Sequence, residues 1–318
     1  MVLNKIIKNK RGIFFTTLVI IILSLFVLTF TFYSQVKERQ SIQKRVVTLN
    51  NFVFAVEENI PRQLRTTGFR IIFLLEKRIV ETGSYITSLD SVFQETFFNG
   101  TVYGETNTET QALMLGATFP EIEATLKQKA EKINANLDFI NPSISISQSD
   151  PWHIEVTLSS NLIIRDKSNL ALWNRTSDIK AYIPIQDFED PLYLINTNGL
   201  VTNKLIKTPY TTFVSGSNTA NLSSHLENSY YISSASAPSF LKKLQGDTSA
   251  DPNGIESLVN LAKLSMQGIE AKDKSIVDYI YFNPSSNPPA CNVIPAGMPS
   301  WFKLDANHAS TYQVTLTC

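Results

Sequence analysis

The chain has 318 residues, of which 28 are Lys or Arg and 28 are Asp or Glu, so its formal net charge at pH 7 is zero. This balance gives no broad positive field of the kind that attracts nucleic acid, and we expect no nucleic-acid partner. The length allows a membrane segment together with one or two domains that have hydrophobic cores.

An uncharged apolar run from Ile13 to Tyr33 is long enough to cross a bilayer as one helix, since about 20 apolar residues suffice. Basic residues precede it, and residues of mixed sign follow it. This asymmetry predicts a single-pass cell-membrane protein with a cytoplasmic N-terminus and the bulk of the chain extracytoplasmic. We therefore expect a basic tail or leader at 1–12, a transmembrane helix at 13–33, and membrane lipid as one partner. A cleaved secretory signal is the alternative, but no small-residue cleavage site follows the run.

A helical stalk is predicted over residues 34–83. Its apolar residues recur at spacings of four and three, which places them on one face of a helix (Ile42, Val46, Leu49, Val53, Val56 and Ile60). Pro61 predicts a kink or break, because proline lacks the amide donor of a helical turn. Either the protein's own ectodomain covers this face or the same helix of neighbouring subunits does, and the sequence leaves both open.

Residues 84–140 are predicted to be helices and loops. The polar stretch from Asn99 to Thr110 is typical of a loop. Thr118 and Glu121 have the spacing of a capping box, which predicts a helix from there to about Asn136.

Residues 141–318 are predicted to form a β-rich extracytoplasmic domain. Apolar and polar residues alternate from Trp152 to Ile164 and again up to Ile185, around a turn at Asp166–Asn169, which indicates an antiparallel hairpin. Asn198-Gly199 indicates a further turn. The remaining segments are a loop at 218–236, a helix at 252–267, a strand at 276–282, an irregular proline-rich segment at 283–300 and a strand at 312–317. The predicted fold class is α+β, with a long N-terminal transmembrane and stalk helix followed by an ectodomain of antiparallel strands and a few helices.

The two cysteines, Cys291 and Cys318, both fall near the C-terminus, and an oxidising exterior favours a disulfide between them. Three triplets match the N-glycosylation pattern, at Asn99, Asn174 and Asn221. Such triplets also arise by chance in a chain rich in Asn, Ser and Thr.

No catalytic, cofactor or metal site is predicted, although several patterns were considered. Ser239 and Lys242 have the spacing of a lysine-activated serine, but the companion motif of such enzymes is missing. Alternating oxygen-bearing residues resemble a calcium loop but lack its glycine and its final glutamate (Asp247, Ser249, Asp251 and Asn253). The three histidines have no metal-ligand spacing, and the acidic residues around Asp190 are equally typical of a solvated turn.

The first ~60 residues resemble type IV pilin-like proteins, especially archaeal ones, in the basic residues that end at Gly12 and in the apolar helix that continues past membrane length. The resemblance implies that a dedicated peptidase cuts between Gly12 and Ile13, and that the helices then pack together as a filament core. The sequence departs from the family at the fifth mature position, where Thr17 replaces the usual glutamate. The ectodomain is also large for a major pilin, which favours a minor or pseudopilin-like component, or a plain anchored surface protein.

We therefore expect a non-enzymatic, membrane-anchored protein with a structural or adhesive role at the cell surface, of which a minor pilin-like component is one form. Copies of itself or other pilin-like subunits would be its partners through the N-terminal helix. The alternative is a membrane-tethered ligand-binding receptor or hydrolase, whose site would be assembled from residues distant in the sequence.

Overall fold

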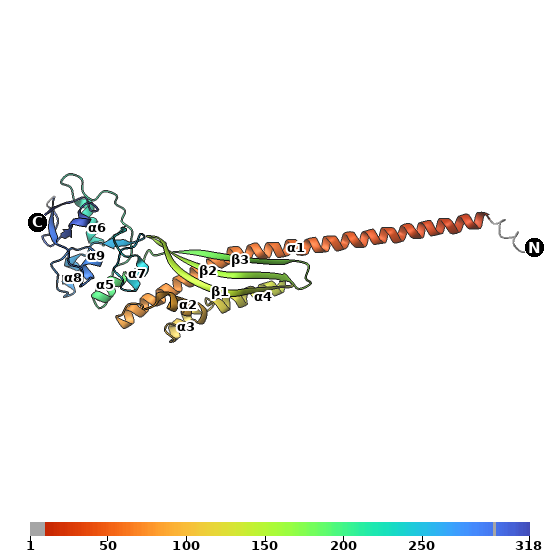
Figure 1. The fold of residues 1–318 in the computed structure, drawn as a ribbon, viewed down its shortest axis with the longest axis horizontal. Helices are drawn as coiled ribbons and strands as arrows, with labels where there is room; N and C mark the ends of the chain where they lie inside the picture. The colour runs from red at the N-terminus through yellow and green to blue at the C-terminus, as the bar shows by residue number, and fades with distance from the viewer. Residues whose placement is uncertain (1–9, 295–296) are drawn as a thin grey trace, which may run out of the picture.

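The computed structural model describes residues 10–294 and 297–318. Its longest element is helix α1 (Lys10–Thr82), whose 73 residues span about 110 Å at about 1.5 Å per residue. The first part of α1 projects away from the rest of the protein, and the second part packs along it (Figure 1). Within the projecting part, the hydroxyls of Thr17, Thr29 and Thr31 donate to the carbonyl four residues earlier at 2.7–2.8 Å. These threonines therefore suit an apolar surrounding.

Helix α1 continues through Pro61, so the break predicted there does not occur. Proline in a helix interior costs about 3 kcal/mol because one backbone hydrogen bond is lost. The turns on either side are held by burial, since Val56, Ile60 and Leu64 are each 1 % exposed against the core. Packing of these residues compensates for the missing hydrogen bond.

The protein's own ectodomain covers the apolar stripe of α1 from Leu49 onward. The buried members are Leu49, Val53, Val56, Ile60, Leu64, Ile71, Ile72, Leu75 and Ile79. Closer to the N-terminus, Ile42 is half-buried and Val46 is 44 % exposed. Of the two possibilities that the sequence left open, the structure therefore shows the first from Leu49 onward: the protein's own ectodomain covers the apolar face of α1. Within the described chain, the short stretch before Leu49 is not buried by the ectodomain.

Three helices follow α1: α2 (Leu89–Asn99), α3 (Thr108–Met114) and α4 (Phe119–Lys132). The predicted capping box is present, because the Thr118 N–H and hydroxyl donate to the Glu121 carboxylate at 3.2 and 2.7 Å. The prediction of α4 as far as Asn136 is wrong. The helix ends at Lys132 because Asn134 adopts a φ of 55°, and the first strand starts in its place.

A three-stranded antiparallel sheet lies along the second half of α1. It consists of β1 (Ala135–Asp150), β2 (His153–Asp166) and β3 (Leu172–Pro184), in the order β1-β2-β3. The predicted hairpin is confirmed as β2 and β3, with Val156 opposite Ala181. Strand β1 begins inside the range predicted as helix and loop. Ser160 stays in register on the buried face of β2, where it is 4 % exposed.

The chain beyond β3 forms a C-terminal unit of short helices and strands at the end farthest from the N-terminus (Figure 1). Its helices are α5 (Pro191–Asn196), α6 (Ala220–Glu227), α7 (Phe240–Leu244), α8 (Leu261–Met266), α9 (Asp278–Phe282) and α10 (Ala306–Ala309). Its strands are β4 (Tyr231–Ser233), β5 (Ile255–Ser257), β6 (Ala290–Ile294), β7 (Lys303–Asp305) and β8 (Thr315–Thr317). Part of this unit has a hydrophobic core of its own, which includes Leu222, Leu258, Ile276 and Tyr312.

Several local predictions fail in this unit. The segment 252–267 is strand β5 and then α8, the segment 276–282 ends as helix α9, and the expected loop at 218–236 contains α6 and β4. The segment 283–300 contains β6, and the last strand is limited to Thr315–Thr317. Each element here has at most eight residues, which is too short for a helical or a strand period to be recognised in the sequence. The α+β fold class, with a long N-terminal helix and antiparallel sheets, is confirmed.

Candidate functional site

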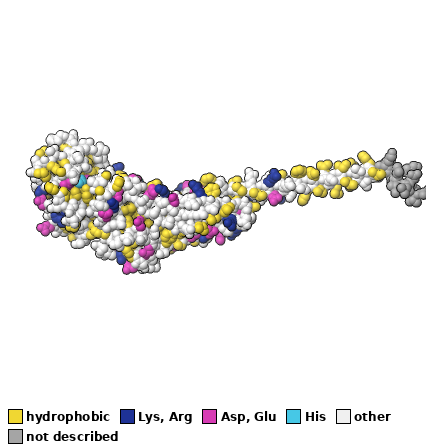
Figure 2. Space-filling view, in the orientation of Figure 1, with side chains coloured by type: hydrophobic (Ala, Val, Ile, Leu, Met, Phe, Trp, Pro, Cys, Tyr) yellow, Lys and Arg dark blue, Asp and Glu magenta, His cyan; other side chains and the backbone are white. Residues whose placement is uncertain are grey.

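The projecting part of α1 is the largest exposed apolar surface of the described chain. Its side chains are open on every side, with Ile13 60 % and Phe26 75 % exposed. Figure 2 shows hydrophobic side chains along this projection, whereas charged side chains lie on the domain and where the helix leaves it. The helix is long and apolar enough to cross a membrane. Gly12 and Ile13 lie at its beginning, both exposed.

Along α1 from the N-terminus, the first polar contact with the ectodomain is made by Arg45. The Arg45 guanidinium lies 3.4 Å from the Asp166 carboxylate at the end of the β2–β3 hairpin and donates to the Ile133 carbonyl at 3.2 Å. Between the apolar run and this contact lie residues 34–44, about 16 Å of helix at about 1.5 Å per residue. These residues make the helix longer than a simple membrane tether needs to be.

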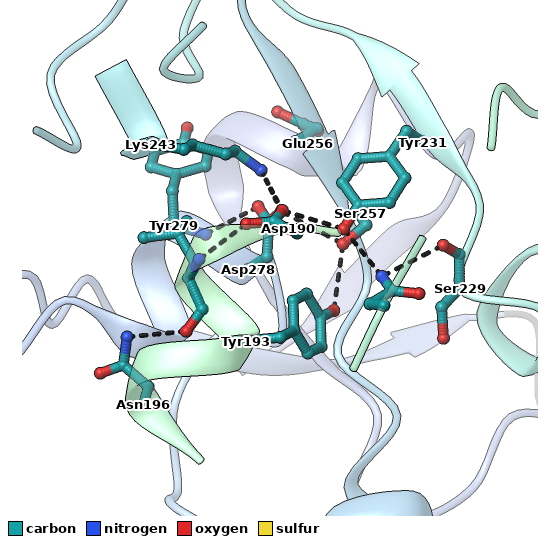
Figure 3. Close-up of polar contacts among 12 residues, drawn as sticks. Asp190, Tyr193, Asn196, Ser229, Tyr231, Lys243, Glu256, Ser257, Asp278 and Tyr279 are labelled. Carbon is teal, nitrogen blue, oxygen red and sulfur yellow. Dashed lines mark hydrogen bonds and ion pairs between the residues drawn. The ribbon is translucent and has the colours of Figure 1, made fainter. Parts of the chain in front are cut away.

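A second candidate site is a buried cluster of charged residues in the C-terminal unit (Figure 3). Lys243 of α7 is fully buried, and its Nζ lies 2.7 Å from Oδ2 of Asp190 and 2.7 Å from Oδ2 of Asp278. Asp190 is the N-cap of α5 and Asp278 is the first residue of α9, so three short elements meet at this ammonium group. We call these three residues the Lys243 cluster.

Neutral donors complete the surroundings of both carboxylates. The Leu192 N–H donates to Asp190 Oδ1 at 2.8 Å, and the Tyr231 hydroxyl donates to Asp190 Oδ2 at 2.9 Å. The Ser257 hydroxyl donates to Asp278 Oδ2 at 3.1 Å and is itself 3.0 Å from the Tyr193 hydroxyl. Both carboxylates are therefore well hydrogen-bonded although neither reaches water.

Burial and charge shift the acidity of these groups in opposite ways. Burial raises the pKa of Asp278 to about 6, against the opposing effect of Lys243. Burial alone would lower the pKa of Lys243, but the two carboxylates outweigh it and hold that pKa above its ordinary value. One lysine faces two acids here, so the cluster has one more negative charge than positive when all three groups are ionised.

A further buried group, Glu76, extends the acidic surroundings onto helix α1. Glu76 is 6 % exposed, and burial together with the nearby charge of Glu189 raises its pKa to about 9. Its carboxyl group is therefore protonated at neutral pH.

A histidine cluster contacts α9 through Tyr279. His308 Nδ1 lies 2.8 Å from the Asp305 carboxylate, and its Nε2 lies 3.0 Å from the Tyr279 hydroxyl and 3.4 Å from the Glu256 carboxylate. Burial opposes a charge on His308, but the bonds to Asp305 and Glu256 raise its pKa to about 10. His308 is thus an imidazolium at neutral pH and serves to pair two buried carboxylates.

The other two histidines have separate surroundings. His153 lies 2.9 Å from Asp150, where the chain turns from β1 into β2. His225 is fully buried, and this burial lowers its pKa to about 4. The described residues contain no group of three or more His, Cys, Asp or Glu that would hold a metal ion.

The structure does not bring Ser239 and Lys242 together as a catalytic pair. Ser239 is buried at the start of α7, whereas Lys242 Nζ bonds to Ser249 Oγ at 3.1 Å and to the Ala250 carbonyl at 2.8 Å. Lys242 also lies 3.8 Å from Asp251, so it ties down the loop that resembles a calcium site. In that loop, the Asp247 and Asp251 carboxylates accept backbone N–H groups two residues ahead, as in ordinary turns.

Cys291 and Cys318 form a disulfide with their Cα atoms 4.9 Å apart. It joins β6 to the C-terminal residue directly after β8. The three sequon asparagines, Asn99, Asn174 and Asn221, are all exposed. The Asn221 side-chain amide donates to the Thr212 carbonyl at 2.8 Å, so a glycan on Asn221 would have to displace this bond.

The Lys243 cluster was not predicted from the sequence. A solvated turn was one of the interpretations left open for the acidic residues around Asp190, and in the structure Asp190 is fully buried. One signal was available in the capping pattern of Asp190 before Pro191, which predicts a helix start rather than an open turn. Comparison of the chain with protein-family models, with curated proteins and with solved structures gives no match in any of the three.

Proposed function

We propose that this protein is a single-pass, membrane-anchored surface protein with a structural or adhesive role, built as a minor pilin-like component. The N-terminus lies in the cytoplasm, α1 crosses the bilayer among lipids, and the ectodomain stands outside. The observation that carries the proposal is that α1 continues as a free helix from the apolar run to Arg45.

A tether to a membrane needs only the apolar run, and a flexible linker would serve for the rest. Here residues 34–44 continue the helix and are exposed except for the half-buried Ile42, and the exposed side chains of Val46 and Val47 follow them. An exposed apolar stripe on a projecting helix is stabilised when it packs against another helix. Copies of this chain, or other pilin-like subunits, supply such a helix.

The overall arrangement also supports a structural role. One continuous helix links the membrane segment to the sheet, and the C-terminal unit with its disulfide lies at the distal end, where it would meet the environment (Figure 1). Such a rigid rod with a compact tip suits the display of a surface away from the membrane.

The first experiment is mass spectrometry of the N-terminus of protein purified from its native membrane. Cleavage after Gly12, which leaves Ile13 first, supports the pilin-like form, and an N-terminus at Met1 or Val2 contradicts it. Substitution of Gly12 by Leu should block the cleavage, whereas Thr17→Val on the same helix serves as the control and should be processed normally.

The second experiment tests contact between copies. The two cysteines of the chain are bonded to each other, so a single added cysteine is a specific probe. Val47→Cys should give disulfide-linked dimers in native membranes, while Asn169→Cys on the hairpin turn should not. Monomers for both variants would contradict assembly through α1 and leave a plain anchor. Protease added to intact cells should degrade the ectodomain, and full protection would contradict the proposed topology.

A further inference from the structure

The Lys243 cluster contains one carboxylate more than an ion pair requires. One buried lysine needs one carboxylate for charge balance, yet Lys243 Nζ bridges two, at 2.7 Å from each. All three side chains are fully buried, so the cluster retains charges in a place where water does not solvate them. An amine held in contact with one carboxyl group, beside a second carboxylate, is the arrangement that amide condensation needs.

We propose that Lys243 and Asp190 condense spontaneously to an intramolecular amide, with Asp278 as the group that transfers the proton. The new bond joins Nζ of Lys243 to Cγ of Asp190, and the bond between Cγ and Oδ2 of Asp190 breaks. Two of the three ammonium protons pass by way of the Asp278 carboxylate to Oδ2, which leaves as water. The third proton stays on the amide nitrogen, and Asp278 ends as the carboxylate that it was at the start.

The hydrogen bonds assign the two acids to different roles. Asp190 accepts from the Leu192 N–H on Oδ1, where negative charge develops when the amine attacks, and from the Tyr231 hydroxyl on Oδ2, the oxygen that leaves. Asp278 also accepts a backbone N–H, from Tyr279 on Oδ1 at 2.7 Å, but its Oδ2 bonds through the Ser257 hydroxyl to the Tyr193 hydroxyl, and this pair of hydroxyls gives Asp278 a path for proton transfer. Asp190 is therefore the acyl donor, and Asp278 is the base and acid.

The acidities agree with this assignment. The pKa of Asp278 is raised by burial to about 6, close to neutral, so it both takes up and releases a proton. Lys243 is an ammonium group in the unreacted cluster, because the carboxylates raise its pKa, and it needs a base in contact before it attacks. Asp278 is that base.

Two physical terms favour the reaction over the ion pair. The fold holds the reacting groups in contact, which removes the entropic cost of bringing an amine and an acid together. The condensation also replaces a buried positive and a buried negative charge with a neutral amide and releases a water molecule. The product closes a covalent loop across a separation of 53 residues and joins α5 to α7 in the C-terminal unit.

The test is the intact mass of the full-length chain, purified in detergent and reduced at its disulfide. We expect a mass lower than that of the mature sequence by one water molecule, and proteolytic digestion should release a branched peptide that contains Lys243 and Asp190. Lys243→Arg and Asp278→Asn should both have the full mass, and both should migrate more slowly than the wild type on a denaturing gel. Lys242→Arg is the matched control and should lose water as the wild type does.

The mass of the wild-type chain shows whether the amide forms, even where a variant does not fold. A full, unmodified wild-type mass overturns the proposal and leaves the cluster as a buried ion pair. A branched peptide that joins Lys243 to Asp278 overturns the assigned roles. Loss of water in Lys243→Arg, or its absence in the Lys242→Arg control, also contradicts the proposal.

Discussion

Gly68 sets the distance between helix α1 and the sheet, so its substitution by Ala should disturb the packing of the two. Gly68 is buried on the face of α1 that meets β2 and β3. A Cβ at this position would overlap Cδ1 of Ile183 and lie 3.2 Å from Cγ2 of Val156. Ile183 and Val156 are both fully buried, so neither has free space into which it moves without disturbing its neighbours.

The magnitude follows from two opposing terms. Alanine gains about 1 kcal/mol over glycine in a helix interior, whereas an extra methyl group in a packed core costs about 1 to 3 kcal/mol. We therefore expect Gly68→Ala to lower the free energy of unfolding by about 1 kcal/mol. Ile183→Val removes Cδ1 and costs about 0.5 to 1.5 kcal/mol alone. In the double variant the added methyl group fills the vacated volume, so the combined loss should fall short of the sum by about 1 kcal/mol.

The assay is urea unfolding of the full chain in detergent, followed by tryptophan fluorescence from Trp152 and Trp173. Ile164→Val is the matched control, because Ile164 is equally buried on β2 but lies eight positions along the strand from Val156. Gly68→Ala should be additive with Ile164→Val and non-additive with Ile183→Val. Additivity within about 0.3 kcal/mol for both pairs would refute close contact between α1 and the sheet at Gly68.

Three further predictions concern the buried acids, the disulfide and the histidine cluster. Glu76→Gln should raise the urea midpoint at pH 8 but change it little at pH 4.5. The pKa of Glu76 in the folded protein, about 9, exceeds its ordinary value of 4.5, so the wild type loses stability as the pH rises between these two values. An equal effect of the substitution at both pH values would contradict this prediction. Cys291→Ala should lower the free energy of unfolding by about 3 to 4 kcal/mol for a closed loop of this size, measured against wild type under oxidising conditions, and a change under 1 kcal/mol would contradict it. The charged form of His308 stabilises the fold fully below its ordinary pKa of 6.5, and this contribution is lost as the pH rises through about 10. A thermal unfolding series from pH 7 to 10 should therefore be flatter for His308→Gln than for wild type, and parallel curves would contradict the assignment.

The two parts of α1 show how one continuous helix serves two environments. Up to Thr48 its side chains face outward on most sides, and from Leu49 its apolar stripe packs on the sheet. Hydrophobic burial makes the second part inseparable from the ectodomain. The length of α1 before Leu49 consequently remains open to contact with lipid or with another subunit.

The sequence by itself determined the features that rest on local pattern. The apolar run from Ile13 to Tyr33 is longer than any core helix requires, the alternation in β2 and β3 has a period of two over many residues, and Thr118 and Glu121 satisfy each other within one turn. Each of these signals depends on neighbours in the chain, so it survives without knowledge of the fold.

Features that depend on contacts between residues distant in the sequence could be found only in the tertiary structure. The stripe of α1 required a covering, but only the packed sheet shows that the protein supplies it from Leu49 onward. Short buried elements such as β5 and α9 show no periodic alternation of apolar and polar residues, because most of their residues are buried. Lys242 and Lys243 are neighbours in the sequence, but the fold gives them different surroundings. Lys243 is enclosed between two aspartates, whereas the Lys242 side chain bonds to Ser249 and Ala250 of a nearby loop. Charge in the sequence marks a residue as polar, but its surroundings in space decide whether it is solvated, paired or placed to react.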